Sequence, residues 1–533
     1  MIYHTALLVA VLLSSATYLP APAKAASCES LADLKLPNTT ISSAETVAAG
    51  AFTLPAGSPP QPGGFAAFKM LPAFCRVKGV IEPSTDSHIE FEVWLPTSGW
   101  NGRYQGAGNG GFGGYINFSG LAEAVNNGYA GSSTDTGHEA SGTNAEWALG
   151  HHEKLVDYFY RAIHDTAENA KAIIQAFYGA GPKYSYFSSC SNGGRQALME
   201  AQRYPADYDG IIAGAPANFF SRAGVSLRWN VYATEADRAS YIPASKLPTI
   251  QGAALAACDT AKDGFIDDPT KCRFDPTKLL CNGAESNSCL TQPQVAALKK
   301  IYTGPRNSNG EQLYPGLMPG GEADPQGWLL WITGAAPGQS LVYTFSTQAT
   351  KYMVFQDPAM HYWALNFDGD TKRDDEVLAD GNATNANLKA FRSRGGKLIL
   401  YHGWNDPALS PMNTVNYYRS VVSTMGRGAD FIRLYMVPGM LHCAGGPGPN
   451  SFGAGTPSAQ ADSEHSMSMA LEHWVEKGVA PAAIIATKYR NNLDPTSGVV
   501  RTRPLCPYPQ AAQYTGPDSR DEAANFVCSV PAK

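Results

Sequence analysis

Apolar and polar residues along the chain follow two different periods. Residues 76–82 and 88–96 alternate apolar and polar side chains at every second position, which predicts two half-buried strands. Residues 151–178 instead repeat apolar side chains at helical spacing and stop at Gly179, which predicts an amphipathic helix that ends at a glycine. The short apolar run at 183–190 predicts a further strand, and the pattern after it predicts another helix.

The strand and helix patterns are interrupted once and then resume. Residues 397–403 form another buried strand pattern, but the segment between about 219 and 384 carries four cysteines, many prolines and glycines, and the aromatic group GWLLWITG. Strands that alternate with helices predict an α/β fold, in which helices cover a mostly parallel sheet. We therefore expect a core made of residues 26–218 and 385–533, with a lid domain inserted at 219–384. Residues 27–65, rich in Ala, Ser, Pro and Gly, predict a loosely structured segment.

Composition and charge restrict the class of protein. The 533 residues are 44% hydrophobic and 16% charged, which is typical of a globular protein and too long for one ordinary core. The net charge is −6 and no basic cluster occurs, so no nucleic-acid partner is expected. Beyond the N-terminus, no segment has the ~18 consecutive apolar residues of a spanning helix, so no membrane partner is expected either.

The N-terminus and the cysteines indicate export. Residues 6–13 are a continuous apolar run and residues 23–25 read AKA, which is typical of a signal peptide, here residues 1–25. Ten cysteines follow, an even number that predicts disulfides in a secreted or periplasmic protein. The absence of any CxxC motif disfavours a zinc site. Close spacing suggests two of the disulfide pairs, Cys258–Cys272 and Cys281–Cys289.

A serine motif provides the first candidate for chemistry. Ser191 stands in SSCSNGG, between the apolar run at 183–190 and the helical pattern that follows. A catalytic serine on a strand-to-helix turn needs small residues two positions before and after it, and here these are Ser189 and Gly193. An ordinary strand-helix turn is the alternative, but the strand before the serine and the helix after it favour a nucleophile.

An acid and a base follow the serine in the chain order that α/β-hydrolases use. A serine hydroxyl needs a histidine to take its proton and an acid to orient that histidine. Asp406 comes just after the strand pattern KLILYHG, and His442 comes just after RLYMVPGM. His402 is a rival base, but it lies within a strand end and fits a core histidine. Asp135 is a rival acid, but it precedes the serine and fits a loop or cap role.

An acyl-transfer enzyme also needs two backbone N–H groups that face the developing oxyanion. We expect the first from Asn192, the residue after the nucleophile. The second is expected from Gly110 or Gly111 in the glycine-rich loop GAGNGGFGG. No Walker lysine follows this loop, so a phosphate-binding role is disfavoured.

Two cysteines lie directly beside the candidate nucleophile and base. Cys190 precedes Ser191, and Cys443 follows His442. A disulfide between these two cysteines would tie the nucleophile and the base together, whereas chance adjacency is the alternative.

Six motifs spread over the chain resemble one known family: GNGGFGG, CSNGGRQ, YDGIIAGAPA, YMVFQDP, YHGWNDP and VPGMLHCAGGPG. The family is that of the tannases and feruloyl esterases, which includes a mono(hydroxyethyl) terephthalate hydrolase, and the resemblance runs from about residue 28 to 530. It implies an α/β-hydrolase core with a large inserted lid and the triad Ser191, Asp406 and His442. It also implies five disulfides, namely Cys28–Cys75, Cys190–Cys443, Cys258–Cys272, Cys281–Cys289 and Cys506–Cys528.

The resemblance also raises the question of a structural Ca²⁺ in the lid; no cofactor is expected for the chemistry itself. The family holds calcium in a loop between two cysteines, with aspartates and backbone carbonyls as ligands. Here CDTAKDGFIDDPTKC keeps Asp259, Asp263 and the carbonyl of Phe265, but it is shorter than the family's pattern. Calcium needs six or more oxygen ligands, so a disulfide-closed acidic turn is the alternative.

The predicted function is that of a secreted serine carboxylesterase acting on esters of aromatic, hydroxycinnamic acids, including plant-derived ones. A tannase or a terephthalate monoester hydrolase is the runner-up, and a non-catalytic binding protein on a hydrolase fold or a metalloenzyme is an alternative from another class. The resemblance implies that a terephthalate monoester hydrolase uses an arginine of the lid to bind the free carboxylate of its substrate. The lid segment 327–345 has no arginine, and Lys351 is the nearest basic residue, which disfavours the terephthalate alternative. The expected aromatic walls of the acyl pocket are Trp328, Trp331, Tyr343 and Tyr352.

Overall fold

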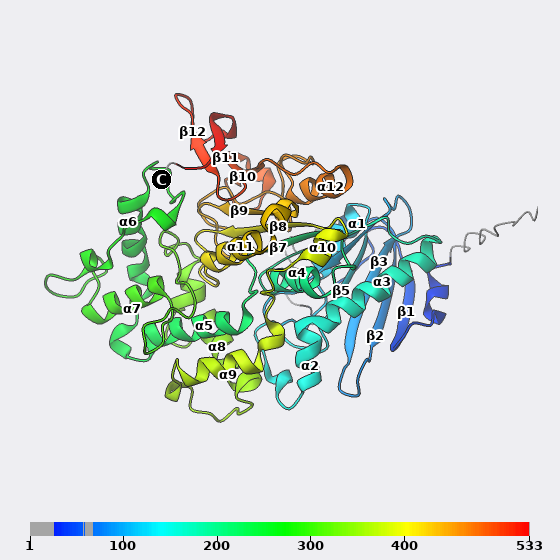
Figure 1. The fold of residues 1–533 in the computed structure, drawn as a ribbon, viewed down its shortest axis with the longest axis horizontal. Helices are drawn as coiled ribbons and strands as arrows, with labels where there is room; N and C mark the ends of the chain where they lie inside the picture. Colours follow the sequence, from blue (N-terminus) through cyan, green and yellow to red (C-terminus); the bar gives the residue numbers. More distant parts are fainter. Residues whose placement is uncertain (1–25, 57, 59–67, 532–533) are drawn as a thin grey trace, which may run out of the picture.

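A computed structural model describes residues 26–56, 58 and 68–531 of the chain. The signal peptide predicted for residues 1–25 lies outside these residues. Figure 1 shows a central sheet with helices packed against it and a largely helical insertion at one end.

The described residues form a nine-stranded sheet in the order β1-β2-β3-β5-β4-β6-β7-β8-β9. The four strands from β1 to β5 in this order pair antiparallel, and all pairs from β5 onward are parallel. The carboxyl ends of the parallel strands therefore meet at one edge of the sheet, where catalytic residues of such folds lie. The strands are β1 (Thr39–Val47), β2 (Phe74–Ile81), β3 (Ile89–Pro96), β4 (Arg103–Ala107), β5 (Ala130–Thr134), β6 (Tyr184–Cys190), β7 (Gly210–Gly214), β8 (Lys397–Gly403) and β9 (Ile432–Val437).

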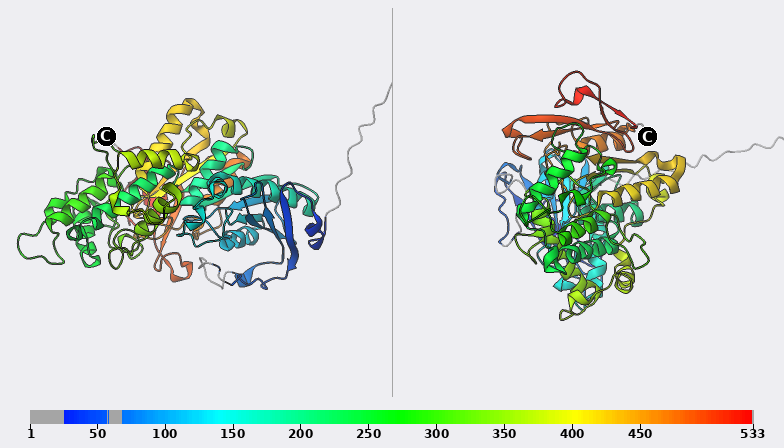
Figure 2. Two further views of the ribbon diagram at one scale, coloured as in Figure 1. Left: turned by 90° about the horizontal axis from the view of Figure 1, so that it is seen from below. Right: turned by 90° about the vertical axis from the view of Figure 1, so that its left-hand side faces the viewer.

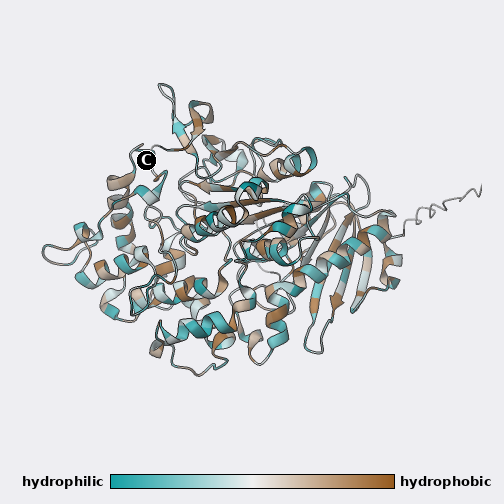
Figure 3. Ribbon diagram, in the orientation of Figure 1, coloured by the Kyte–Doolittle hydropathy of each residue, from teal (hydrophilic) through white to brown (hydrophobic). Residues whose placement is uncertain are grey.

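Helices cover both faces of the sheet and bury its apolar residues; the ribbon in Figure 3 is brown where residues are hydrophobic. On one face lie α3 (Ala162–Tyr178), α4 (Asn192–Arg203), α10 (Lys389–Ser393) and α11 (Pro411–Met425). On the other face lie α1 (Phe118–Asn126) and α12 (Met467–Lys477). This arrangement confirms the predicted α/β class and is consistent with an α/β-hydrolase fold.

Two sequence predictions need correction. Residues 39–47, expected to be loosely structured, form the edge strand β1, whose partly exposed side chains give no clear apolar alternation. The helix predicted over 151–178 ends at left-handed Gly179 as expected, but it is not continuous. It consists of α2 (His152–Val156), a π-helical turn η4 (Asp157–Arg161) and α3. A π-helical turn inserts a residue into the α-helix without changing the apolar pattern enough to be visible in the sequence.

The predicted lid, residues 219–384, lies between β7 and β8 and gathers at one end of the sheet, opposite β1 (Figure 2). It packs around its own apolar centre, which includes Leu298 and Trp328. Its helical elements are α5 (Phe220–Glu235), α6 (Leu247–Cys258), α7 (Gln292–Thr303), α8 (Leu341–Gln348), α9 (Gly369–Val377) and the π-helical turns η9 (Leu329–Thr333) and η10 (Ala349–Val354). Beyond the core lie two hairpins, formed by β10 (Ile484–Tyr489) with β11 (Val499–Leu505) and by β12 (Ala511–Tyr514) with β13 (Phe526–Ser529).

All ten cysteines form disulfides, which confirms the prediction from their even number. The pairs are those that the close spacing and the family resemblance implied: Cys28–Cys75, Cys190–Cys443, Cys258–Cys272, Cys281–Cys289 and Cys506–Cys528.

A buried arginine fastens the lid loop between Cys258 and Cys272 to the C-terminal strand β11. Arg503 is only 2% exposed, and its guanidinium donates to Asp263 Oδ2 at 2.9 Å and to Asp267 Oδ1 at 3.2 Å. The neighbouring Arg501 donates to the Asp263 carbonyl at 3.0 Å. Both guanidinium groups also lie against the Phe265 ring, 5.3 and 5.5 Å from its centroid.

The residues of this loop do not fit a calcium ion. Calcium takes about six to eight oxygen ligands that converge on one point. Instead, the Asp259 carboxylate accepts the backbone N–H groups of Lys262, Asp263 and Gly264 at 2.7, 3.4 and 2.9 Å. The carboxylates of the loop also do not come together as metal ligands would. In the described part of the chain, three or more His, Cys, Asp or Glu side chains have closely spaced ligand atoms only on helix α3. The positive charge between Asp263 and Asp267 is the Arg503 guanidinium.

We expect the melting temperature of the pure protein to be the same with and without a calcium chelator. Arg503→Met should instead lower the free energy of unfolding by about 3–5 kcal/mol, because it leaves two carboxylates without their buried partner. Thermal and urea denaturation, with elemental analysis for calcium, measure both effects. Stoichiometric calcium, or a clear drop in melting temperature on chelation, would contradict this expectation.

Candidate active site

Ser191 lies on the sharp turn between β6 and α4. Its backbone has φ = 66°, a left-handed conformation that a non-glycine residue adopts only when its surroundings impose it. The turn leaves no room for side chains around it: a Cβ on Gly193 would lie 1.9 Å from Ser189 Oγ, and one on Gly194 would lie 2.3 Å from the Gly214 carbonyl oxygen. Ser189, two positions before Ser191, therefore fits only because the residue that faces its hydroxyl, Gly193, has no side chain.

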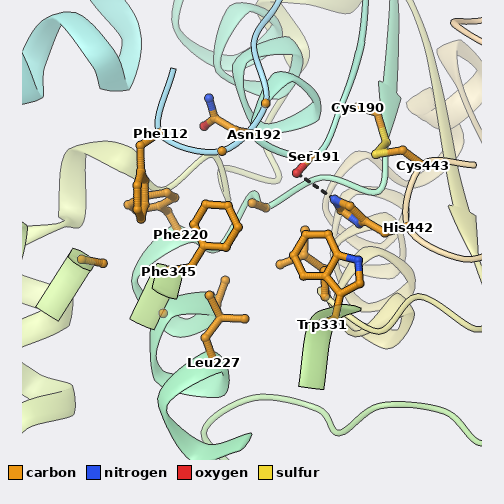
Figure 4. A pocket seen from close by; sticks show the side chains of 18 of the residues that line it. Phe112, Cys190, Ser191, Asn192, Phe220, Leu227, Trp331, Phe345, His442 and Cys443 are labelled. Carbon is orange, nitrogen blue, oxygen red and sulfur yellow. Dashed lines mark hydrogen bonds between the residues drawn. A yellow bond between two sulfur atoms is a disulfide. The ribbon is translucent and has the colours of Figure 1, made fainter. Parts of the chain in front are cut away.

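Ser191, His442 and Asp406 form one hydrogen-bonded chain, although 251 residues separate the serine from the histidine. The His442 Nε2 atom lies 2.9 Å from Ser191 Oγ, the contact that is dashed in Figure 4. Its Nδ1 atom lies 2.7 Å from Asp406 Oδ2. Because the carboxylate accepts the Nδ1–H proton, Nε2 is the unprotonated nitrogen and accepts the serine hydroxyl.

The Asp406 carboxylate is buried but strongly hydrogen-bonded. Its Oδ1 accepts the N–H groups of Ala408 and Leu409 at 2.7 and 2.9 Å. Burial alone would raise its pKa, but the positive charge that His442 carries when protonated and the hydrogen bonds from His402 and His442 outweigh burial and hold the pKa below the usual value. The surroundings of Asp406 therefore favour its ionised form.

Neither the rival base, His402, nor the rival acid, Asp135, forms a hydrogen bond with Ser191 or His442 in the described part of the chain; each has other hydrogen-bond partners. His402 is fully buried, and its Nε2–H donates to Asp406 Oδ2 at 3.0 Å, while Nδ1 faces the Thr414 hydroxyl at 2.8 Å. The sequence indicated only a core histidine here and missed this support of the acid. Asp135 accepts the backbone N–H groups of Glu90 and Gly137, and burial raises its pKa well above the usual value.

The residues expected to supply the oxyanion hole, Asn192 and the loop glycines Gly110 and Gly111, line the same pocket as Ser191. Asn192 is the first residue of α4, so its N–H group has no partner within the helix. The N–H of Gly110 donates to the Tyr115 hydroxyl at 3.0 Å, which leaves Gly111 as the better candidate of the two predicted loop glycines. Gly111 has φ = 56° and a Cβ there would lie 2.1 Å from the Gly142 carbonyl oxygen, so the loop can pass only with glycine at this position.

The Cys190–Cys443 disulfide joins the residues next to the nucleophile and the base, with 5.9 Å between its Cα atoms. Cys443 has φ = 62°, so the segment after His442 is also held in a strained conformation. Both cysteines line the pocket beside the triad (Figure 4).

A pocket of about 350 Å³ opens beside Ser191 between the core and the lid. Its walls are apolar. Phe112 comes from the glycine-rich loop, and the lid supplies Phe220 and Leu227 from its helix α5 as well as Trp331 and Phe345. The Trp331 ring meets the His442 ring edge-on, with 4.9 Å between centroids. Among the described residues that line the pocket, the side chains with N or O atoms are those of Ser191, Asn192, Trp331 and His442.

One of the four predicted aromatic walls lines this pocket, namely Trp331. Trp328 is buried in the lid's own core, Tyr343 borders a different hollow of the lid, and the Tyr352 hydroxyl contacts Glu146. The residues missed in the sequence, Phe112, Phe220, Leu227 and Phe345, carry no local signal except the phenylalanine within GNGGFGG. Lys351, the basic candidate, does not line the pocket.

A metal-dependent site is not formed around the serine. In the part of the chain that the structure describes, the histidine and acidic side chains that converge as metal ligands could are His164, Asp165 and Glu168. They lie on α3, outside the residues that line the pocket, and His164 Nδ1 is bonded to Asp207 Oδ2 at 2.6 Å.

Comparison with known proteins identifies the family. The sequence model described as "Tannase and feruloyl esterase" matches residues 75–529. The chain is 44% identical to an uncharacterised esterase of Xanthomonas campestris pv. campestris, over 94% of this chain and 91% of that protein. It is 33% identical to mono(2-hydroxyethyl) terephthalate hydrolase of Piscinibacter sakaiensis, over 86% of this chain and 85% of that protein. The crystal structure of feruloyl esterase B from Aspergillus oryzae matches with a TM-score of 0.85 and 30% identity, covering 94% of this chain and 99% of that one. The chain belongs to the tannase and feruloyl esterase family.

Proposed function

We propose that this esterase is an exported serine carboxylesterase that hydrolyses esters of aromatic, hydroxycinnamic acids through an acyl-enzyme. The observation that carries the proposal is the unbroken chain from Ser191 through His442 to Asp406 at the wall of an apolar pocket. Export is supported by the five disulfides and by the N-terminal sequence pattern. None of the described helices is long and apolar enough to cross a membrane.

The geometry supports the two-step acyl-transfer reaction. Ser191 Oγ attacks the ester carbonyl while His442 Nε2 takes the hydroxyl proton, and Asp406 stabilises the imidazolium that forms. The carbonyl oxygen becomes an oxyanion that accepts hydrogen bonds from the N–H groups of Asn192 and Gly111. Collapse of this intermediate breaks the ester bond, and His442 returns the proton to the departing alcohol. Water, activated by the same histidine, then releases the acid from Ser191.

The pocket supports a planar aromatic acyl group. Rings of Phe220, Trp331 and Phe345 face the space beside Ser191, and stacking on such rings adds about 0.5–1.5 kcal/mol to the burial of apolar area. A named relative, feruloyl esterase B, has the same overall fold.

The runner-up substrates need polar partners. A gallate carries three hydroxyl groups where a ferulate carries one, and a terephthalate monoester carries a charged carboxylate; burying these additional or charged groups without partners is unfavourable. Apart from Ser191 and His442, which the chemistry uses, the described pocket wall offers N or O side-chain atoms only at Asn192 and at the indole of Trp331, and it holds no lysine or arginine to pair with a carboxylate. A non-catalytic binding protein would not need a complete triad. The complete hydrogen-bonded chain of Ser191, His442 and Asp406 therefore disfavours that alternative.

Ser191→Ala and His442→Ala should each abolish most turnover while the fold is kept. In a cooperating triad, loss of the nucleophile or the base removes catalysis on the order of 10⁶-fold. Turnover of methyl ferulate and circular dichroism of each variant test this. Near-normal activity of a folded Ser191→Ala variant would show that another group is the nucleophile.

Replacing Cys190 and Cys443 together with alanine should lower kcat on the order of 10²-fold, because a misplacement of about 1 Å between nucleophile and base costs that much. The matched control is Cys281→Ala with Cys289→Ala, which removes a lid disulfide away from the pocket and should leave kcat unchanged. Equal losses in both double variants would mean that general destabilisation, not positioning, is responsible.

When kcat/KM is measured for four esters under the same conditions, we expect the highest value for methyl ferulate. Methyl gallate and a terephthalate monoester should be slower because their polar groups lack partners in the pocket, and p-nitrophenyl octanoate should be slower because it cannot stack. A preference for the octanoate would contradict the aromatic pocket. A preference for the terephthalate monoester would require a carboxylate partner that the described wall does not show.

A further inference from the structure

The Tyr158 hydroxyl lies between the two halves of the candidate oxyanion hole. Its oxygen is 2.9 Å from the Gly111 carbonyl oxygen and 3.0 Å from Asn192 Oδ1. Both neighbours are acceptors, and burial raises the pKa of the phenol, so the tyrosine keeps its proton and acts as the donor. One hydroxyl thus links the glycine loop to the first residue of α4, the two segments whose N–H groups face the substrate carbonyl.

A buried arginine holds the same asparagine from the other side. Arg195 is 0% exposed, and its Nε–H donates to Asn192 Oδ1 at 2.8 Å. Its other nitrogens donate to the carbonyl oxygens of Phe159 at 2.6 Å and Tyr158 at 3.1 Å. These two carbonyls belong to the π-helical turn η4, so the irregular turn supplies acceptors to the guanidinium.

Arg195 differs from the other deeply buried arginines in its partners. Arg228 pairs with Asp374 at 2.8 Å, and Arg503 pairs with Asp263 at 2.9 Å. The described partners of the Arg195 guanidinium are neutral oxygens and the faces of Tyr158, Phe159 and Phe220. A buried charge without an opposite charge is costly, and a need for packing alone is met better by an apolar side chain.

The uncompensated charge has a use beside an oxyanion. Arg195 is one helical turn after Ser191, and its backbone N–H bonds to the Ser191 carbonyl at 3.1 Å. In the proposed reaction, negative charge develops on the substrate carbonyl oxygen next to Asn192, in a pocket with mostly apolar walls. Fixed positive charge and fixed donors stabilise such a transition state more than the neutral substrate.

We infer that Tyr158 and Arg195 are positioning residues of the oxyanion hole, which fix the donors of Gly111 and Asn192 and add positive potential there. This inference rests on the proposed acyl-transfer function. It predicts that both residues affect the tetrahedral state much more than the binding of the substrate.

The sharpest test is Tyr158→Phe, which removes one oxygen and keeps the ring that packs against Arg195. We expect kcat for methyl ferulate to fall on the order of 10-fold, with KM changed less than about 2-fold. The matched control is Tyr160→Phe, which removes a hydroxyl from the same π-helical turn, where the ring lies against Arg203 instead. The control should keep the wild-type kcat and KM.

The inhibition constant of a transition-state mimic distinguishes a role in the oxyanion hole from a role in folding or packing alone. Phenylboronic acid binds the serine oxygen through boron and forms a tetrahedral anion, whereas free ferulate binds as a ground-state product. The inhibition constant of phenylboronic acid should rise by the same factor as kcat falls in Tyr158→Phe, and that of ferulate should stay unchanged. An equal rise for both inhibitors, or unchanged kcat, would overturn the inference.

Arg195 is tested by a graded pair of variants. Arg195→Lys keeps the charge but loses the fork of hydrogen bonds, and Arg195→Met loses both, so kcat should decrease from wild type to Lys to Met. If Arg195→Met does not fold, Tyr158→Phe and Arg195→Lys decide. Failure of the proposed function is seen separately: an active Ser191→Ala variant refutes the serine mechanism, whereas an inactive Ser191→Ala with a fully active Tyr158→Phe refutes only this inference.

Discussion

The Asp406 carboxylate keeps its negative charge inside the protein because four donors surround it. Two are ring N–H groups, from His442 and His402, and two are backbone N–H groups of the loop that follows β8. This arrangement fixes the orientation of His442, and His442 in turn meets Ser191 only because the β6–α4 turn holds the serine at a strained φ. The sheet brings the ends of β6, β8 and β9 to one edge, and the Cys190–Cys443 disulfide then joins two of the segments directly.

The core supplies the chemistry and the lid supplies most of the shape. Trp331 and Phe345 come from the lid, and Trp331 also contacts the His442 ring, so the lid reaches the proposed catalytic base itself. Closure of the pocket therefore affects both the fit of the acyl group and the exclusion of water from the histidine. The described wall is mostly apolar and, beside Ser191, Asn192 and His442, offers a polar group on the acyl ring only the indole N–H of Trp331, so selectivity depends largely on shape and on stacking.

The sequence predicted the parts of the site that local patterns determine. Strand ends located Ser191, Asp406 and His442, and small residues marked the turn and the loop that carries Gly111. The acyl pocket was largely missed, since Phe220, Leu227 and Phe345 come from lid helices whose placement depends on tertiary packing. Tyr158 was missed for a similar reason, because a π-helical turn shifts it to face Asn192 within a segment that looks like one regular helix. The edge strand β1 was missed because exposed strands lack a clear alternation.

Two buried arginines show how the same residue type takes different roles according to its partners. Arg503 lies between Asp263 and Asp267, so its charge is neutralised locally and its effect is to fasten the lid loop to β11. Arg195 is bound by carbonyls, an amide oxygen and aromatic faces, which satisfy its N–H groups but cancel little of its charge. In a low-dielectric interior the remaining field acts on whatever charge forms nearby. In the proposed acyl-transfer reaction, negative charge forms beside Asn192, the residue that Arg195 holds.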